Sequence, residues 1–226
     1  GGIEIDYNPD FLELESMVMT RAEQQYGQTI IPADPIDWSG ALQKAYLLLE
    51  KSRDYRLCSI VTRGLTHKVG IRGTLQGIDF ILSLTEACWQ NAHPSITFDG
   101  EVDLLPRANA IAELNSAEGL IGDLRHTEIS LGVAGRISIN RLEKILNNKS
   151  DGDEFSRDQL LQILQDETRN NNVELSAIKQ LQSQINKLEN QLKQHFGEEP
   201  APDFSSLKSL ISNINPIRES QQAEDH

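Results

Sequence analysis

Apolar residues recur at spacings of three and four along most of this chain, and this periodicity narrows the possible folds more than any other feature. The clearest run comes late, where a strict 3-4-3-4 pattern is formed by Ile178, Leu181, Ile185, Leu188 and Leu192. Such spacing puts one apolar stripe on a helix and is typical of a coiled-coil seam. Because an isolated helix of this length is marginal in water, the stripe must be buried against another surface.

Helical spacing also fills the first two thirds of the chain. One helix is expected after Asn8-Pro9, because proline is favoured in a first turn, and another after Asp37, a typical N-cap. We expect a helical bundle whose core includes Leu48, Leu57, Ile60, Val61, Leu65, Ile78, Leu82 and Trp89. Polar and apolar residues alternate around a glycine-containing turn at 127–139, which predicts one small β-hairpin in an otherwise all-α fold.

A change of composition divides the chain. Residues 147–154 read N-N-K-S-D-G-D-E, without an apolar residue, as is typical of a linker. We predict a helical bundle domain over 1–147, a linker over 148–155, and a helical extension with the coiled-coil seam and a disordered tail over 156–226.

Two uses of the seam remain open. The amphipathic helix that carries Phe204, Leu207, Ile211 and Ile214 could fold back on it within one chain. Alternatively, two chains could bury it across a twofold axis. The second alternative predicts a homodimer with self-association through Ile178, Leu181, Ile185, Leu188 and Leu192.

Charge and cysteine content restrict the partners and the compartment. A formal net charge of -13 disfavours nucleic acid and anionic membrane surfaces, since both need a basic footprint. Cys58 and Cys88 lie in apolar helical runs and form no C-x-x-C pair, as expected of buried thiols in a reducing compartment. The sequence shows neither a signal-peptide pattern nor an apolar run of transmembrane length, so we expect a cytoplasmic protein without membrane insertion.

The residues that could form motifs for catalysis or cofactor binding do not have the spacing that those motifs require. Gly70, Gly73 and Gly77 are not followed by the Lys-Ser or Lys-Thr of a phosphate loop and indicate a close helix–helix corner instead. The acidic stretch 151–154 lacks the spacing of a calcium loop. The five histidines form no H-x-x-x-H or H-E-x-x-H pattern. We therefore predict no catalytic residue, no cofactor and no metal site, and a protein that is not an enzyme.

One constellation suggests a binding surface. Between positions 51 and 72 the sequence has six basic residues and a single acidic one, Asp54. The basic residues are Lys51, Arg53, Arg56, Arg63, Lys68 and Arg72. These residues could pair internally with the acidic first helix or with Glu101 and Asp103. They could instead dock an acidic protein partner, and the partner-binding residues would then be Arg53, Arg56, Arg63 and Arg72.

Several short motifs, taken in order, resemble one family. Residues 6–11 (D-Y-N-P-D-F) resemble its Asp/Tyr-x-Pro opening, and residues 48–57 (L-L-E-K-S-R-D-Y-R-L) resemble its LL-x-K-(S/T)-(R/K)-D-L-R stretch. Residues 106–111 (P-R-A-N-A-I) resemble its R-x-N-A-(L/I) signature. Together they are similar to the ImpA-type N-terminal domain of TssA proteins from the bacterial type VI secretion system. Tyr55 stands where the family usually has Leu.

The resemblance implies a non-enzymatic, cytoplasmic assembly factor. Its partners would be baseplate, tube and sheath proteins of the secretion apparatus. The expectation of a homo-oligomer comes from the seam. The ring-forming C-terminal region that the resemblance also implies has no counterpart after residue 150. Two alternatives stay open: a small-ligand-binding or enzymatic helical domain with a pocket between its helices, and a structural coiled-coil adaptor in which residues 156–215 alone carry function.

Overall fold

A computed structural model gives the structure of the chain and describes residues 1–19, 24–31, 33–149 and 152–215. The disordered tail predicted after Pro216 lies outside the described residues. Within these ranges the chain is mostly α-helical, with three short antiparallel strand pairs, which confirms the predicted fold class. Among the same residues, no helix combines the length and the apolar character needed to cross a membrane.

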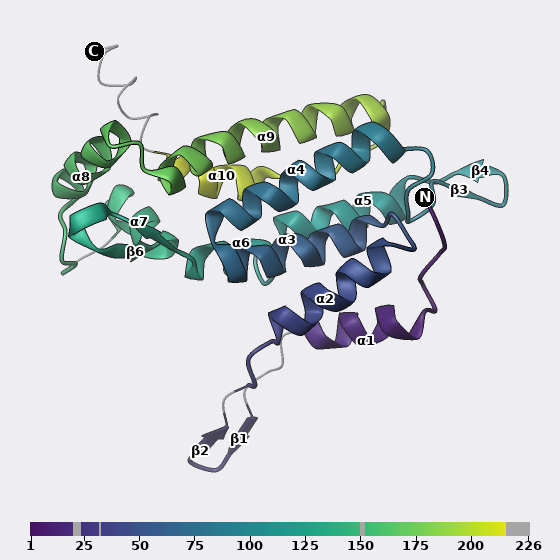
Figure 1. Ribbon diagram of the computed structural model, residues 1–226, viewed down its shortest axis with the longest axis horizontal. Helices are drawn as coiled ribbons and strands as arrows, with labels where there is room; N and C mark the ends of the chain where they lie inside the picture. The colour runs from purple at the N-terminus through teal and green to yellow at the C-terminus, as the bar shows by residue number, and fades with distance from the viewer. Residues whose placement is uncertain (20–23, 32, 150–151, 216–226) are drawn as a thin grey trace.

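The helices follow one another along the whole chain (Figure 1). The first five are α1 (Pro9–Val18), α2 (Trp38–Leu49), α3 (Tyr55–Val69), α4 (Ile71–Cys88) and α5 (Leu105–Ala112). The next five are α6 (Leu120–His126), α7 (Ile139–Leu146), α8 (Arg157–Arg169), α9 (Val173–Phe196) and α10 (Ser205–Ile214). Single 3₁₀ turns lie at Glu113–Asn115 and Gly132–Ala134.

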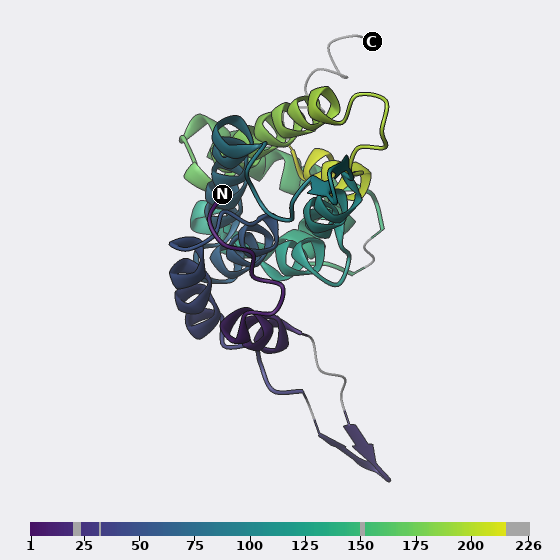
Figure 2. The same cartoon turned by 90° about the vertical axis from the view of Figure 1, so that its right-hand side faces the viewer.

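The strand pairs are all two-stranded. They are β1 (Gln24–Tyr26) with β2 (Thr29–Ile31), β3 (Thr97–Phe98) with β4 (Glu101–Val102), and β5 (Glu128–Ser130) with β6 (Arg136–Ser138). The β5–β6 pair confirms the hairpin predicted at 127–139. The β1–β2 hairpin extends away from the helical body (Figure 2), and the sequence pattern predicted neither it nor β3–β4.

Helix α3 is the central element and packs against α2, α4, α5 and α6. Asp54 caps its N-terminus by accepting a hydrogen bond from the backbone N–H of Arg56. Gly70, with φ of 76°, ends α3 and turns the chain into α4. A Cβ at Gly77 would lie 2.8 Å from the Cα of Thr62, so this glycine allows the two helices to approach closely.

Helix α9 runs along α4, and α10 folds back against both α9 and α7 (Figure 1). Gln184 donates to Asp79 and Gln191 donates to Glu86, each pair being 105 residues apart, so α4 and α9 are parallel. Buried apolar residues from α1 to α10 form one core. Both sides of the 148–155 segment contribute to that core, and the division of the chain at this segment stays a prediction.

The expected core residues of the bundle are almost all inside. Seven of the eight are buried, and Leu65 is half-buried at the edge of the core. Cys58 is buried and Cys88 is half-buried, both as free thiols. Burial raises the pKa of the Cys58 thiol well above its usual range, so this thiol stays protonated.

Candidate functional site

A groove of about 740 Å³ opens beside α1, α3 and α5. Its lining includes four buried apolar residues, Phe11 and Val18 of α1, Ile60 of α3, and Ala110 of α5. Asn8 sets the direction of α1, because its side-chain oxygen accepts hydrogen bonds from the backbone N–H groups of Asp10 and Phe11 at 2.9 and 3.3 Å. The cap thus orients the helix face that lines the groove.

Arg56 lies at the wall of this groove between two carboxylates. Its Nη1 is 2.6 Å from Asp6 Oδ1, and its Nη2 is 2.8 Å from Oδ2 of Asp54, which is fully buried. The guanidinium also lies over the ring of Phe11, 4.8 Å from its centroid. Burial opposes the charge of Arg56, but hydrogen bonds and charges of Asp54 and Asp6 outweigh it and raise its pKa. A hydrogen bond with Glu4, and then Arg56, hold the pKa of Asp6 below its usual range.

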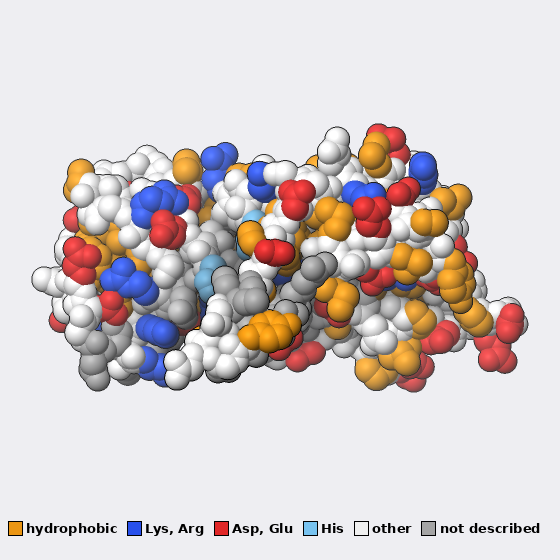
Figure 3. Space-filling view, turned by 90° about the horizontal axis from the view of Figure 1, so that it is seen from below, with side chains coloured by type: hydrophobic (Ala, Val, Ile, Leu, Met, Phe, Trp, Pro, Cys, Tyr) orange, Lys and Arg blue, Asp and Glu red, His pale blue; other side chains and the backbone are white. Residues whose placement is uncertain are grey.

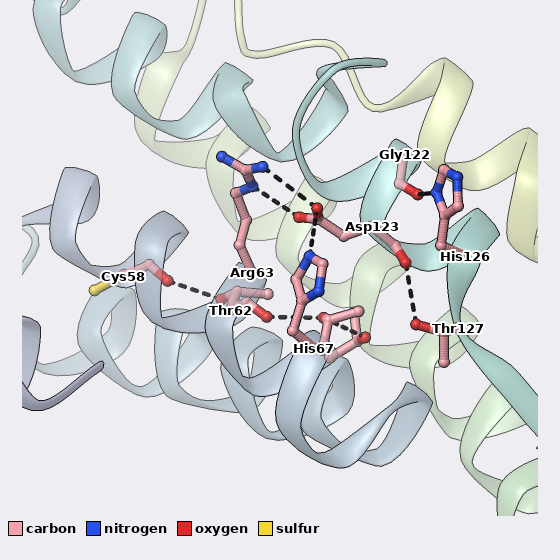
Figure 4. Close-up of polar contacts among 10 residues, drawn as sticks. Cys58, Thr62, Arg63, His67, Gly122, Asp123, His126 and Thr127 are labelled. Carbon is pink, nitrogen blue, oxygen red and sulfur yellow. Dashed lines mark hydrogen bonds and ion pairs between the residues drawn. The ribbon is translucent and has the colours of Figure 1, made fainter. Parts of the chain in front are cut away.

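Arg63 reaches the other end of the wall and is bound to α6 (Figure 4). Its Nε and Nη2 donate to the carboxylate of Asp123 at 2.7 and 3.3 Å, and His67 Nε2 lies 2.8 Å from the same carboxylate. Trp38 stacks on His67 with ring centroids 4.8 Å apart, and the Arg63 guanidinium lies 5.0 Å from the Trp38 ring. This cluster therefore ties α2, α3 and α6 together.

Hydroxyl groups beside this cluster are engaged with the backbone. Thr62 donates to the carbonyl of Cys58 and Thr127 to the carbonyl of Asp123, as Figure 4 shows. Among the described residues, no group of three or more His, Cys, Asp or Glu side chains is arranged to hold a metal ion. The contacts around the His67–Asp123 pair are those of a structural tie between helices.

The other two predicted partner-binding arginines lie outside the groove. Arg53 is exposed and donates to the carbonyl of Leu49. Arg72 is exposed at the start of α4, where it lines a separate hollow next to the α8–α9 connection. The structure therefore brings only Arg56 and Arg63 to one site. Both are paired internally: Arg56 with Asp6 and Asp54, and Arg63 with Asp123. These carboxylates belong neither to the first helix nor to the 101–103 segment that the sequence suggested.

All five seam residues are buried within the single chain. Ile178, Leu181, Ile185, Leu188 and Leu192 are each at most 1% exposed. Helix α9 that carries them packs against α4 and α10, so the fold-back of the Phe204 helix is present. Self-association through these side chains stays a prediction, and it would require α9 to leave the core.

Arg107 begins the R-x-N-A-(L/I) signature, but the sequence reasoning gave this residue no role. Its side chain is fully buried, its Nε donates to the Pro94 carbonyl at 3.0 Å, and its two terminal nitrogens donate to the carbonyls of Trp89 and Ala92. Burial lowers the pKa of Arg107 to about 10. Arg107 thereby fixes the turn that brings Pro94 to the groove. Its spacing could have indicated burial, since positions 107, 110, 111 and 114 share one helix face.

The residues of the family-like motifs converge on this site. Asp6 and Phe11 come from the first motif, Arg56 from the second, and Asn109 and Ala110 from the third, and all five line the groove. Sequence reasoning identified the motifs but not the groove, because their meeting depends on how α1, α3 and α5 pack.

Comparison with known proteins identifies the family that these motifs resemble. Residues 1–116 match the family described as ImpA, N-terminal, type VI secretion system. Type VI secretion system component TssA1 of Pseudomonas aeruginosa is 27% identical over 113 residues, which are 50% of this chain and 33% of that protein. The match thus spans one third of the relative's length.

A solved structure shares the fold. It is the N-terminal domain, including the conserved ImpA_N region, of the TssA component of the type VI secretion system from Burkholderia cenocepacia. It aligns with a TM-score of 0.66 and 18% identity over 99% of this chain and 88% of that chain. With its family match over residues 1–116, which takes in nearly the whole lining of the groove, this chain belongs to the ImpA N-terminal family of type VI secretion proteins.

Proposed function

We propose that this chain is a non-enzymatic interaction domain of a TssA-like subunit, which works in the cytoplasm. It contacts baseplate, tube and sheath proteins while the secretion apparatus assembles. The observation that carries the proposal is the convergence of three family-like motifs on one open groove. Apolar side chains lie at its base, and the charged side chains Arg56 and Arg63 on its wall are held by neighbouring carboxylates. A surface of this kind is suited to binding another protein.

The coiled-coil adaptor alternative has less support. An adaptor would need the apolar face of α9 to be free for another chain, whereas α4 and α10 cover it. The groove offers a partner both apolar contacts and polar groups.

A retention assay tests the proposal. The chain is immobilised and challenged with individually expressed baseplate, tube, sheath and membrane-complex subunits. Asn109→Trp fills the groove from an exposed position, and Asn190→Trp on the exposed side of α9 is the matched control. The wild type and the control should retain at least one subunit, and Asn109→Trp should lose it. Retention of no subunit by the wild type would refute the proposal, as would unchanged retention by Asn109→Trp.

A further inference from the structure

The groove is acidic, although two arginines lie on its wall. Four carboxylates line it, those of Asp6, Glu15, Glu113 and Glu118. Two more, Asp54 and Asp123, hold the arginines from behind. Two guanidinium groups thus meet six carboxylates, which leaves a formal surplus of four negative charges around the opening.

The arginines are poorly placed to attract an acidic partner. Arg56 has carboxylate oxygens at 2.6 and 2.8 Å, and Arg63 has one at 2.7 Å. These are short, charge-assisted contacts, and a new carboxylate would have to displace them. It would also meet the like charges of the rim, which disfavours binding.

The rim glutamates, in contrast, are available. Glu15, Glu113 and Glu118 are exposed, and none of them forms an ion pair with a cation among the described parts of the chain. Figure 3, which views the molecule from below, shows mainly acidic and hydrophobic side chains on its right-hand half, where α1 lies, and a group of basic side chains on its left-hand half.

The base of the groove sets a second requirement. Phe11, Val18, Ile60 and Ala110 are apolar and have no polar group to offer a ligand, while Met19 and Pro106 add exposed apolar surface at the edges. A segment that fits both features carries apolar side chains toward the base and basic side chains toward the rim.

We infer that the groove binds an apolar segment flanked by Lys or Arg, presented by a protein of the secretion apparatus. This inference rests on the proposed function and gives the chemistry of the partner. The charge of this partner is opposite to that of the acidic partner, which was one of the two alternatives that the sequence left open beside internal pairing of the arginines.

Peptide binding with two matched charge variants tests the inference. The probes are overlapping synthetic peptides that cover the baseplate, tube and sheath subunits. The rim variant combines Glu15→Lys, Glu113→Lys and Glu118→Lys. The control combines Glu50→Lys, Glu198→Lys and Glu199→Lys, which are exposed and do not line the groove, so both variants have the same net charge.

The peptides that bind wild type should be apolar with basic flanks. The rim variant should bind them about tenfold or more weakly, whereas the control should stay within about twofold, since three rim charges each contribute modestly. Raising the salt concentration should weaken binding by the wild type, because exposed charges are screened. Thermal melting checks that both variants fold, and single Glu→Gln substitutions replace the rim variant if it melts early.

The outcomes separate the two proposals. If intact subunits are retained but the bound peptides are acidic, or the rim variant binds basic peptides as well as wild type does, the charge inference is wrong and the proposed function stands. If wild type retains no intact subunit, the proposed function falls, and the inference falls with it.

Discussion

Helices α3 and α9 each carry the pattern that suggested contacts with another molecule, but their surroundings differ. The arginines of α3 are neutralised by carboxylates, yet Arg56 and Arg63 still border an open groove. The stripe of α9 is closed off by α4 and α10. A periodic pattern therefore identifies which face of a helix is used, but it does not say whether the occupant is the same chain or another one.

The largest expected effect comes from charging the α9 stripe. Leu181→Asp with Leu188→Asp places two carboxylates where the side chains are at most 1% exposed. We expect a loss of more than about 5 kcal/mol in the free energy of unfolding, enough to unfold many domains of this size. Circular dichroism and urea unfolding measure it. Ser183→Asp with Asn190→Asp, both exposed on α9, is the control. A folded monomer that keeps its full helical signal would contradict this expectation. It would support the alternative in which the α9 stripe serves self-association and is not needed for the fold of the single chain.

The next effect concerns the charge pair of α3. Arg56→Gln leaves the fully buried carboxylate of Asp54 without its main partner, so we expect destabilisation of about 3–5 kcal/mol by urea unfolding. Arg136, whose side chain is 54% exposed, is the control, and Arg136→Gln should change stability by less than about 0.5 kcal/mol. An equally small effect at Arg56 would mean that this arginine is free to serve a partner.

Arg63→Gln should cost less than Arg56→Gln. Asp123 keeps its contact with His67 when Arg63 is lost, so we expect about 1–3 kcal/mol. The double variant Arg63→Gln, His67→Gln should lose more free energy of unfolding than the sum of the losses in the two single variants. The reason is that Asp123 would then lose both partners. Strict additivity in a double-mutant cycle would show that the two side chains hold Asp123 independently.

The smallest expected effect is at the first residue of α3. Tyr55→Phe removes the hydrogen bond of 2.8 Å to Thr85 Oγ1 and should cost about 0.5–1.5 kcal/mol at pH 7. Burial raises the pKa of Tyr55 to about 12, above its unfolded value of about 10. Its contribution to stability is therefore complete below pH 10 and lost as pH rises through 12. Urea unfolding of both proteins across this range should show a steeper fall for wild type; parallel curves would contradict the assignment.

Local patterns predicted much of this fold because they act over a few residues. The start of α1 at Pro9, the Asp37 cap of α2, the glycines at the α3–α4 corner and the hairpin at 127–139 each depend on neighbours in sequence. Heptad spacing also marked α9 correctly as a helix with one buried face. These features follow from backbone geometry and side-chain spacing alone.

Partners far apart in the sequence could not be predicted in the same way. Arg63 and Asp123 are 60 residues apart, and nothing in the spacing of α3 points to α6. Helix α4 and its C-cap carry their own 3-4-3-4 series of Leu75, Ile78, Leu82, Thr85 and Trp89, but the spacing does not say whether that series packs against α3 or against α9. One threonine in that series lowers its apolar signal. The groove was also hidden, because its charge depends on carboxylates from several segments.

The parallel pairing of α4 with α9 has a consequence for synthesis of the chain. Contacts such as Asp79 with Gln184 join positions 105 residues apart, so α4 emerges from the ribosome long before its cover exists. At about 5–20 residues per second, the wait is roughly 5–20 s. During that interval the part of α4 that α9 later covers stays exposed, which makes this helix the expected target for a chaperone that binds unfinished proteins.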